Sequence, residues 1–266
     1  MDLATPTGPA DVRVSSDVVK RVFQQPGRGR RQPARSCLWV ELPVTEYERV
    51  WRLQIRLAAA RRNGSLDRDV ILLTEHQPVF TLGRRGGLDN LIAPPVALDG
   101  AEIPVFQVER GGNITYHGPG QLVLYPIVDL LGVGLRVVDY VWSLEEVAIR
   151  TAAAWGIKAR RSPANRGVWV GASKLASVGI AVRRGISFHG IALNVSLSLE
   201  PFRWIHPCGL RGVEVTSMER ELSCPVSTAG VRRTIKRETE AVFGVELLAQ
   251  DISGLETLLP AEGLHG

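Results

Sequence analysis

Short runs of apolar and β-branched residues, several of them separated only by tight-turn sequences, recur along this chain between a few helical patterns. Strand-like runs occupy residues 38–42, 70–74, 79–82, 103–108, 122–127, 168–170, 175–182 and 188–195, and helical patterns occupy about 46–62, 139–155 and 227–243. The helices and strands do not alternate one by one, as a doubly wound parallel sheet would require. The pattern therefore predicts an α/β fold of the α+β type, a mixed sheet with helices packed on one side.

The ends of several elements carry local signals. Thr45 followed by Glu48 predicts a capping box, in which the hydroxyl and the carboxylate each satisfy a backbone N–H at the start of the first helix. Residues 183–185, Arg-Arg-Gly, predict a tight hairpin turn between the strands on either side. His76 lies in a short polar segment that ends in a proline, and we interpret it as a hairpin turn residue rather than a catalyst.

Composition indicates an ordinary globular protein, because 45% of its 266 residues are hydrophobic and 22% are charged. A chain of this length can bury a substantial core. We expect a flexible basic extension over residues 1–36, a single folded domain over 37–250 and a tail over 251–266. The chain has no apolar stretch of about 18 residues and no apolar core of signal-peptide length near Asp2, which predicts no membrane span and a cytoplasmic protein.

Cysteine spacing and net charge make several classes of protein unexpected. Cys37, Cys208 and Cys224 show no C-x-x-C spacing, so we predict neither a disulfide framework nor a metal site. Residues 1–36 carry four of the five net positive charges. The charge of the remaining chain therefore does not indicate a nucleic-acid partner.

Residues 110–121 read RGGNITYHGPGQ and stand between two strand-like runs. Glycines let backbone N–H groups approach a ligand closely, and Pro119 fixes one backbone angle, so the loop has a defined shape. Two interpretations stay open. The segment is either a wall of small residues around a substrate with His117 facing it, or a long hairpin loop whose histidine caps a neighbouring carbonyl.

Cys208 stands directly between a proline and a glycine, which hold its thiol on a sharp turn. A structural cysteine more often lies inside an apolar run, so this setting favours a nucleophile. Lys174, the only lysine between residues 159 and 235, stands at the start of an apolar strand. It is either a solvated residue at a strand end or an ammonium group that lowers the pKa of a nearby thiol and favours the thiolate.

Five segments together resemble, in their order along the chain, the signature motifs of the lipoyl(octanoyl) transferases, the LipB family. They are EHQPVFTLGR at residues 75–84, RGGNITYHGPGQ at 110–121, GASKLASVG at 171–179, SFHGIALNV at 187–195 and PCG at 207–209. The resemblance covers residues 38 to about 245. It implies a fold similar to the catalytic domain of biotin and lipoate ligases.

The resemblance also implies an activity and its partners. An octanoyl or lipoyl group would pass from the thioester of acyl carrier protein to a lysine of the lipoyl domains in 2-oxoacid dehydrogenase complexes and the glycine cleavage H protein. Cys208 would carry the acyl group, and Lys174 would hold the thiolate and handle protons. The residues implied to line the acyl chain and its carbonyl are Arg110, Gly111, Gly112, Asn113, Ile114, Thr115, Tyr116, His117, Ser177, Val178, Gly179, Gly190, Ile191 and Ala192. No cofactor, metal, nucleic acid or membrane is implied.

Two features depart from the family pattern. His206 stands before Pro207, where the family commonly has asparagine, and the basic extension over 1–36 has no counterpart in the family pattern.

Residues 27–31, GRGRR, weakly resemble the basic glycine loop of ATP-dependent lipoate and biotin ligases. Such a ligase is therefore one alternative, and a non-catalytic acyl-binding relative is the other.

Overall fold

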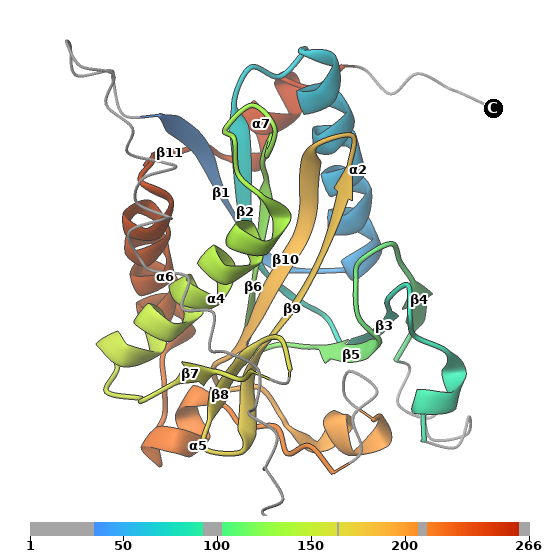
Figure 1. The fold of residues 1–266 in the computed structure, drawn as a ribbon, viewed down its shortest axis with the longest axis vertical. Helices are drawn as coiled ribbons and strands as arrows, with labels where there is room; N and C mark the ends of the chain where they lie inside the picture. Colours follow the sequence, from blue (N-terminus) through green and yellow to red (C-terminus); the bar gives the residue numbers. More distant parts are fainter. Residues whose placement is uncertain (1–34, 93–102, 164, 207–211, 261–266) are drawn as a thin grey trace, which may run out of the picture.

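The computed structural model describes residues 35–92, 103–163, 165–206 and 212–260, and an eight-stranded mixed sheet forms its centre (Figure 1). In spatial order the strands are β11 (Glu246–Ala249), β1 (Ser36–Thr45), β2 (Asp69–His76), β6 (Gln121–Ile127), β10 (Ile186–Asn194), β9 (Ser173–Arg183), β8 (Val168–Val170) and β7 (Arg160–Arg161). The first three strands are parallel, and each later strand is antiparallel to its neighbour. The mixed sheet predicted from the sequence is confirmed.

A second, three-stranded sheet stands beside the first, in the order β4 (Val105–Gln107), β3 (Val79–Leu82) and β5 (Ile114–His117). β2 and β3 are separated by only two residues, yet they belong to different sheets. The predicted hairpin at His76 is therefore wrong. His76 is the last residue of β2 and is fully buried, because the chain crosses there from one sheet to the other.

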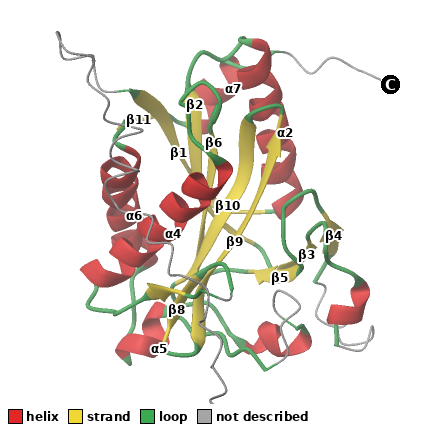
Figure 2. Cartoon of the chain, in the orientation of Figure 1, coloured by secondary structure: helices red, strands yellow, loops and turns green. Residues whose placement is uncertain are grey.

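Helices cover both faces of the large sheet, which corrects the predicted one-sided packing (Figure 2). α4 (Val137–Ala154) and α6 (Thr228–Phe243) pack with strand residues such as Trp39 and Ile71, whereas α2 (Tyr47–Asn63) packs with Val40 and Leu72. Neighbouring strand residues point to opposite faces, so each central strand contributes to both cores. The remaining helical segments are η1 (Leu88–Asn90), η2 (Glu200–Trp204), α5 (Met218–Leu222) and α7 (Ile252–Thr257).

Most predicted element ends agree with the structure. The Ser227 hydroxyl accepts a hydrogen bond from the Gly230 N–H at the start of α6. Residues 184 and 185 both have positive φ and form the tight turn between β9 and β10, as predicted. The capping box is wrong, because α2 has no side-chain cap and Thr45 instead donates its hydroxyl proton to the Pro43 carbonyl.

The C-terminal part of the chain extends the fold beyond the predicted boundary at residue 250. α7 lies within the segment that we expected to be a tail, and Leu255 and Leu259 are buried in the core beneath α2. Two apolar residues at this spacing are a weak sequence signal, because only one turn of helix separates them. Among the described residues, no helix combines the length and the apolar character needed to cross a membrane.

Candidate active site

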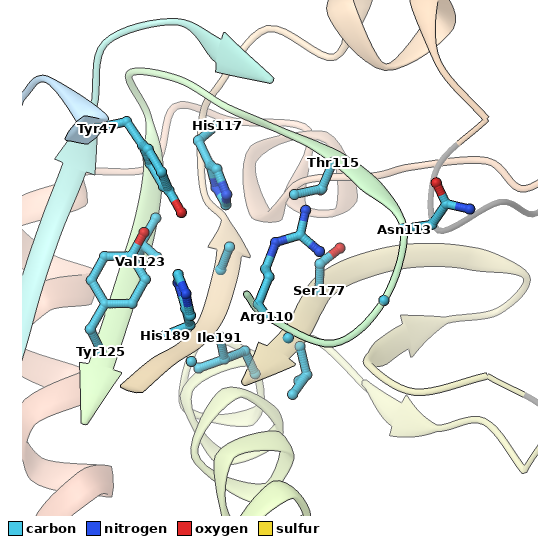
Figure 3. Close-up of a pocket in the computed structure, with 15 residues that line it drawn as sticks. Tyr47, Arg110, Asn113, Thr115, His117, Val123, Tyr125, Ser177, His189 and Ile191 are labelled. Carbon is cyan, nitrogen blue, oxygen red and sulfur yellow. The ribbon is translucent and has the colours of Figure 1, made fainter. Parts of the chain in front are cut away.

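A narrow cavity, here called the inner cavity, lies between the small sheet and the middle of the large sheet (Figure 3). Its lining residues are Tyr47, Arg110, Gly112, Asn113, Thr115, His117, Val123, Tyr125, Ser177, Val178, Gly179, His189, Gly190, Ile191 and Ala192. The centres of water molecules can occupy about 40 Å³ of it. The cavity is therefore narrow rather than wide and open.

Eleven of the fourteen residues predicted to bind substrate line this cavity: Arg110, Gly112, Asn113, Thr115, His117, Ser177, Val178, Gly179, Gly190, Ile191 and Ala192. Ile114 and Tyr116 do not, because side chains alternate along β5 and these two pack into the apolar core of the small sheet. They contact that core beside Phe80 and Phe202. We therefore remove Ile114 and Tyr116 from the predicted acyl-lining set.

Arg110 fixes the glycine loop that precedes β5. Its Nη2 donates to the carbonyl oxygen of Thr81 at 2.6 Å and to the Thr81 hydroxyl at 2.8 Å, and its Nη1 donates to the Gly111 carbonyl at 3.1 Å. The Gly111 N–H donates to the Ile180 carbonyl of β9 at 2.8 Å. These bonds tie the loop to both sheets, so the cavity wall is held at two points.

His117 is held by hydrogen bonds on both ring nitrogens. Gln121 donates its amide N–H groups to the Tyr116 carbonyl and to Asn194 Oδ1, which leaves Gln121 Oε1 to accept from His117 Nδ1 at 2.6 Å. His117 Nε2 lies 3.5 Å from the Thr81 hydroxyl. Burial, followed by the neighbouring His76, lowers the pKa of His117 well below its usual value. The imidazole is therefore neutral at pH 7.

This hydrogen-bonded chain continues from His117 to the strand that carries Lys174. Asn194 Nδ2 donates to the Thr216 carbonyl at 2.9 Å, and the Thr216 N–H donates to the Lys174 carbonyl at 3.0 Å. Of the two interpretations of residues 110–121, this geometry favours a shaped wall whose histidine orients its neighbours.

Tyr47 and His76 lie beside His117, Tyr125 contacts His76, and none of the three was predicted as a site residue. Tyr47, the first residue of α2, stacks on His117 with ring centroids 5.8 Å apart. His76 Nδ1 donates to the Thr45 carbonyl at 3.0 Å, so its Nε2 accepts the Tyr125 hydroxyl proton at 2.8 Å. Burial lowers the pKa of His76 to about 4. Tyr47 and Tyr125 come from separate elements, and no local pattern identifies them.

His189 is a further cavity residue that we did not predict, although it stands inside the SFHGIALNV segment. Its φ of 57° is unusual for a side-chain-bearing residue in a strand, and its N–H donates to Gln54 Oε1 at 2.8 Å. Its Nε2 lies 3.5 Å from Glu109 Oε2, and this contact is the main cause that lowers the pKa of Glu109 to about 2. Burial lowers the pKa of His189 itself. A neutral histidine donating to a carboxylate fits both shifts.

Gly190 and Gly179 are glycines because other backbone passes too close. A Cβ on Gly190 would collide with the Leu124 carbonyl oxygen of β6, and a Cβ on Gly179 would lie 2.9 Å from the Gly111 carbonyl oxygen. Both contacts are shorter than a real Cβ tolerates, so the neighbouring backbone would have to move. Both glycines line the cavity, so a side chain at either position would displace backbone beside it.

A second hollow, here called the outer groove, adjoins the inner cavity. It is lined by Arg85, Gly111, Gly112, Asn113, Val137, Val138, Val141, Asn165, Arg166, Lys174, Val178, Gly179 and Ile180. Gly112, Asn113, Val178 and Gly179 line both spaces. Gly111, the last of the predicted substrate residues, therefore borders the groove rather than the cavity.

Lys174 is only 3% exposed and lines the outer groove from β9. Its ammonium nitrogen lies 5.4 Å from the centre of the Trp169 ring, within cation–π range. Gly167, at a φ of 117°, leaves room for the lysine stem, because a Cβ there would lie 2.7 Å from Lys174 Cε. A buried lysine facing a groove replaces the solvated strand-end interpretation.

Cys208, the predicted nucleophile, lies outside the described residues. The described chain resumes at residue 212, and the Lys174 N–H donates to the Glu214 carbonyl at 2.8 Å. Cys37 is buried in the core and Cys224 is exposed, and neither lines the cavity or the groove. Within the described ranges, no three His, Cys, Asp or Glu side chains converge as a metal-binding group.

Comparisons with known proteins show which family this chain is similar to. The family described as "Lipoyl protein ligase A/B catalytic domain" matches residues 46–240. An octanoyltransferase of Desulfotalea psychrophila is 48% identical over 77% of this chain and 93% of its own length, and an octanoyltransferase of Syntrophobacter fumaroxidans is 47% identical over 85% and 98%. A solved lipoate-protein ligase A bound with ATP superimposes with a TM-score of 0.65 at 16% identity, covering 85% of this chain and 92% of that chain. This last likeness concerns the fold alone.

Proposed function

This chain belongs to the octanoyltransferases of the lipoyl protein ligase A/B catalytic-domain family, and from that premise we propose an octanoyl transfer from acyl carrier protein to a lipoyl domain through an acyl-enzyme on Cys208. The chain is thus an acyltransferase that acts in protein lipoylation. The donor, the thioester on Cys208 and the individual acceptor proteins belong to the proposal.

The observation that carries the proposal is the narrow cavity beside the groove that holds Lys174. Glycines, Val178, Ile191 and Ala192 give the cavity an apolar, small-residue lining suited to a straight alkyl chain. Each CH₂ group buried there contributes about 0.8 kcal/mol. Because four residues line both spaces, an acyl chain in the cavity would leave its carbonyl near Lys174.

In the first half of the reaction, the Cys208 thiolate attacks the thioester carbonyl carbon, and the bond to the carrier sulfur breaks. Cys208 then holds the octanoyl group as a new thioester, and the carrier thiolate leaves and takes up a proton. In this proposal the Lys174 ammonium stabilises the attacking thiolate and supplies that proton. Lys174 is only 3% exposed, and a positive charge shielded from water in this way attracts a nearby thiolate more strongly than one in open solvent does.

In the second half, the lysine amine of the acceptor attacks the thioester on Cys208. An amide bond forms, the Cys208 sulfur leaves, and Lys174, now a neutral amine, takes the proton that the acceptor amine loses. Replacement of one thioester by another is close to neutral in free energy, and formation of an amide from a thioester is downhill. The cycle therefore needs no nucleotide.

The proposal is tested by incubating the full chain and a lipoyl domain either with octanoyl carrier protein alone or with free octanoate and ATP. The account predicts that the lipoyl domain gains one octanoyl mass with the carrier-bound donor and without ATP. Transfer that occurs only from octanoate with ATP would assign the chain to the ligases. Binding of the donor without any transfer would make it an acyl-binding relative.

A further inference from the structure

The outer groove has a positively charged rim. The Arg85 and Arg166 side chains are both exposed, and none of the described lining residues is acidic. The Arg85 N–H donates to the Gly112 carbonyl at 3.1 Å, which fixes its position on the glycine loop. Arg166 makes a long ion pair of 3.9 Å with Glu145.

That ion pair leaves Arg166 available for an anionic ligand. Glu145 is better satisfied by other groups, because it accepts from the Gly167 N–H at 2.9 Å and lies 3.3 Å from Arg161 Nε. The Arg166 side chain is 59% exposed, whereas that of Glu145 is 2% exposed. The guanidinium group thus points mainly to solvent at the edge of the groove.

The lining of the groove also includes an apolar part. Val137, Val138 and Val141 stand on the first turns of α4, and Val137 and Val138 are 47% and 54% exposed. Asn113 and Asn165 add amide groups to the same lining. A ligand that fills the groove would therefore meet apolar, amide and cationic groups, with Lys174 also in the lining.

We propose that the outer groove binds the phosphopantetheine arm of the acyl donor, with Arg85 and Arg166 contacting its phosphodiester. This inference rests on the proposed function. The arm carries an anionic phosphate at one end, a branched apolar segment and two amides along its length, and the thioester at the other end. Each of these parts has a counterpart in the groove lining, namely the two arginines, the valines and asparagines, and Lys174.

The charges of the groove favour the donor arm over the acceptor lysine as its occupant. The acceptor lysine is an ammonium group in solution, and the two arginines of the rim repel a cation. A phosphodiester is attracted by the same charges, and guanidinium groups bind phosphate oxygens through paired hydrogen bonds. The acceptor is therefore expected to reach the acyl-enzyme from another side.

The test compares three octanoyl donors, which are S-octanoylpantetheine, S-octanoyl-4′-phosphopantetheine and octanoyl carrier protein, each varied with the lipoyl domain saturating. The lipoyl domain is then varied with the donor saturating. We expect Arg85→Gln and Arg166→Gln each to raise the KM of the two phosphate-bearing donors about fivefold. The KM of S-octanoylpantetheine stays within about twofold, because that donor has no phosphate. Arg84→Gln is the matched control, since Arg84 is also exposed and is adjacent to Arg85 but does not line the groove.

Three outcomes would overturn the inference. An equal rise in KM for donors with and without phosphate would show that the arginines do not contact the phosphate. A rise for octanoyl carrier protein alone would place the arginines against carboxylates on the carrier surface. A rise in the KM of the lipoyl domain, with donor KM values unchanged, would assign the groove to the acceptor. If the wild-type chain transfers octanoyl from none of the donors, the proposed function itself fails.

Discussion

The buried His76 makes stability depend on pH, and this dependence follows from its surroundings. The side chain is fully buried, with one ring nitrogen bonded to the Thr45 carbonyl and the other to the Tyr125 hydroxyl. Protonation would turn Nε2 from an acceptor into a donor facing that hydroxyl, in a site from which water is excluded. Burial accordingly lowers the pKa of His76 from 6.5 to about 4.

The direction of the effect follows from proton binding in the two states. As pH falls below about 6.5 the unfolded chain takes up a proton on His76, whereas the folded chain takes it up only near pH 4. The stabilisation is fully present above pH 6.5 and is lost as pH falls through the window from 6.5 to 4. With 1.36 kcal/mol per pKa unit, the loss between pH 7.5 and pH 5 is about 2 kcal/mol.

Urea unfolding of the wild-type chain and of His76→Gln at pH 7.5, 6 and 5 measures how much of the pH-dependent stability comes from His76. We expect His76→Gln to be less stable at pH 7.5 and to lose about 2 kcal/mol less of unfolding free energy between pH 7.5 and pH 5. Tyr125→Phe is the control, because it removes one hydrogen bond of His76 but keeps the titrating ring. An identical pH slope in the wild type and in His76→Gln would refute the reasoning.

Three further changes test the site. Lys174→Ala is expected to slow alkylation of Cys208 at neutral pH about tenfold, and an unchanged rate and pH profile would contradict the thiolate-holding role. Gly190→Ala forces a Cβ against a backbone carbonyl of β6 and should lower the unfolding free energy by about 2 kcal/mol or more. Gly87→Ala should not, because a Cβ at that loop position makes only ordinary contacts. Ala192→Leu narrows the inner cavity and should lower the ratio of kcat/KM for octanoyl to that for butanoyl donors about tenfold, and an unchanged ratio would place the acyl chain elsewhere.

The strands and helices were predictable because their signals are local. Ser227 caps the start of α6 and Gly244 caps its end, as their cap preferences predict, and residues 184–185 form the predicted turn. The coverage of both faces was missed although β2 is buried along its whole length, and its apolar run without alternation is the pattern of a strand covered on both faces. The transfer of β3 to a second sheet depends on pairing with β4 and β5, which no local pattern encodes.

The candidate site was predictable where glycines and polar residues cluster in one segment. Asn113, Thr115 and His117 were expected at the cavity and lie there, but taking the whole segment also included Ile114 and Tyr116, which the pleat of β5 turns into the apolar core. Tyr47 of α2, Val123 and Tyr125 of β6, and His189 of β10 also line the cavity and were missed. They meet only in the folded chain, where long-range packing brings these elements together.

The most direct test of the central claim is the mass of the intact protein after incubation with octanoyl carrier protein in the absence of acceptor. The account predicts a single added octanoyl group that hydroxylamine removes, as it does a thioester, and that is lost in Cys208→Ser but kept in Cys224→Ser. An adduct that survives Cys208→Ser, or the absence of any adduct while transfer to the lipoyl domain proceeds, would contradict the acyl-enzyme.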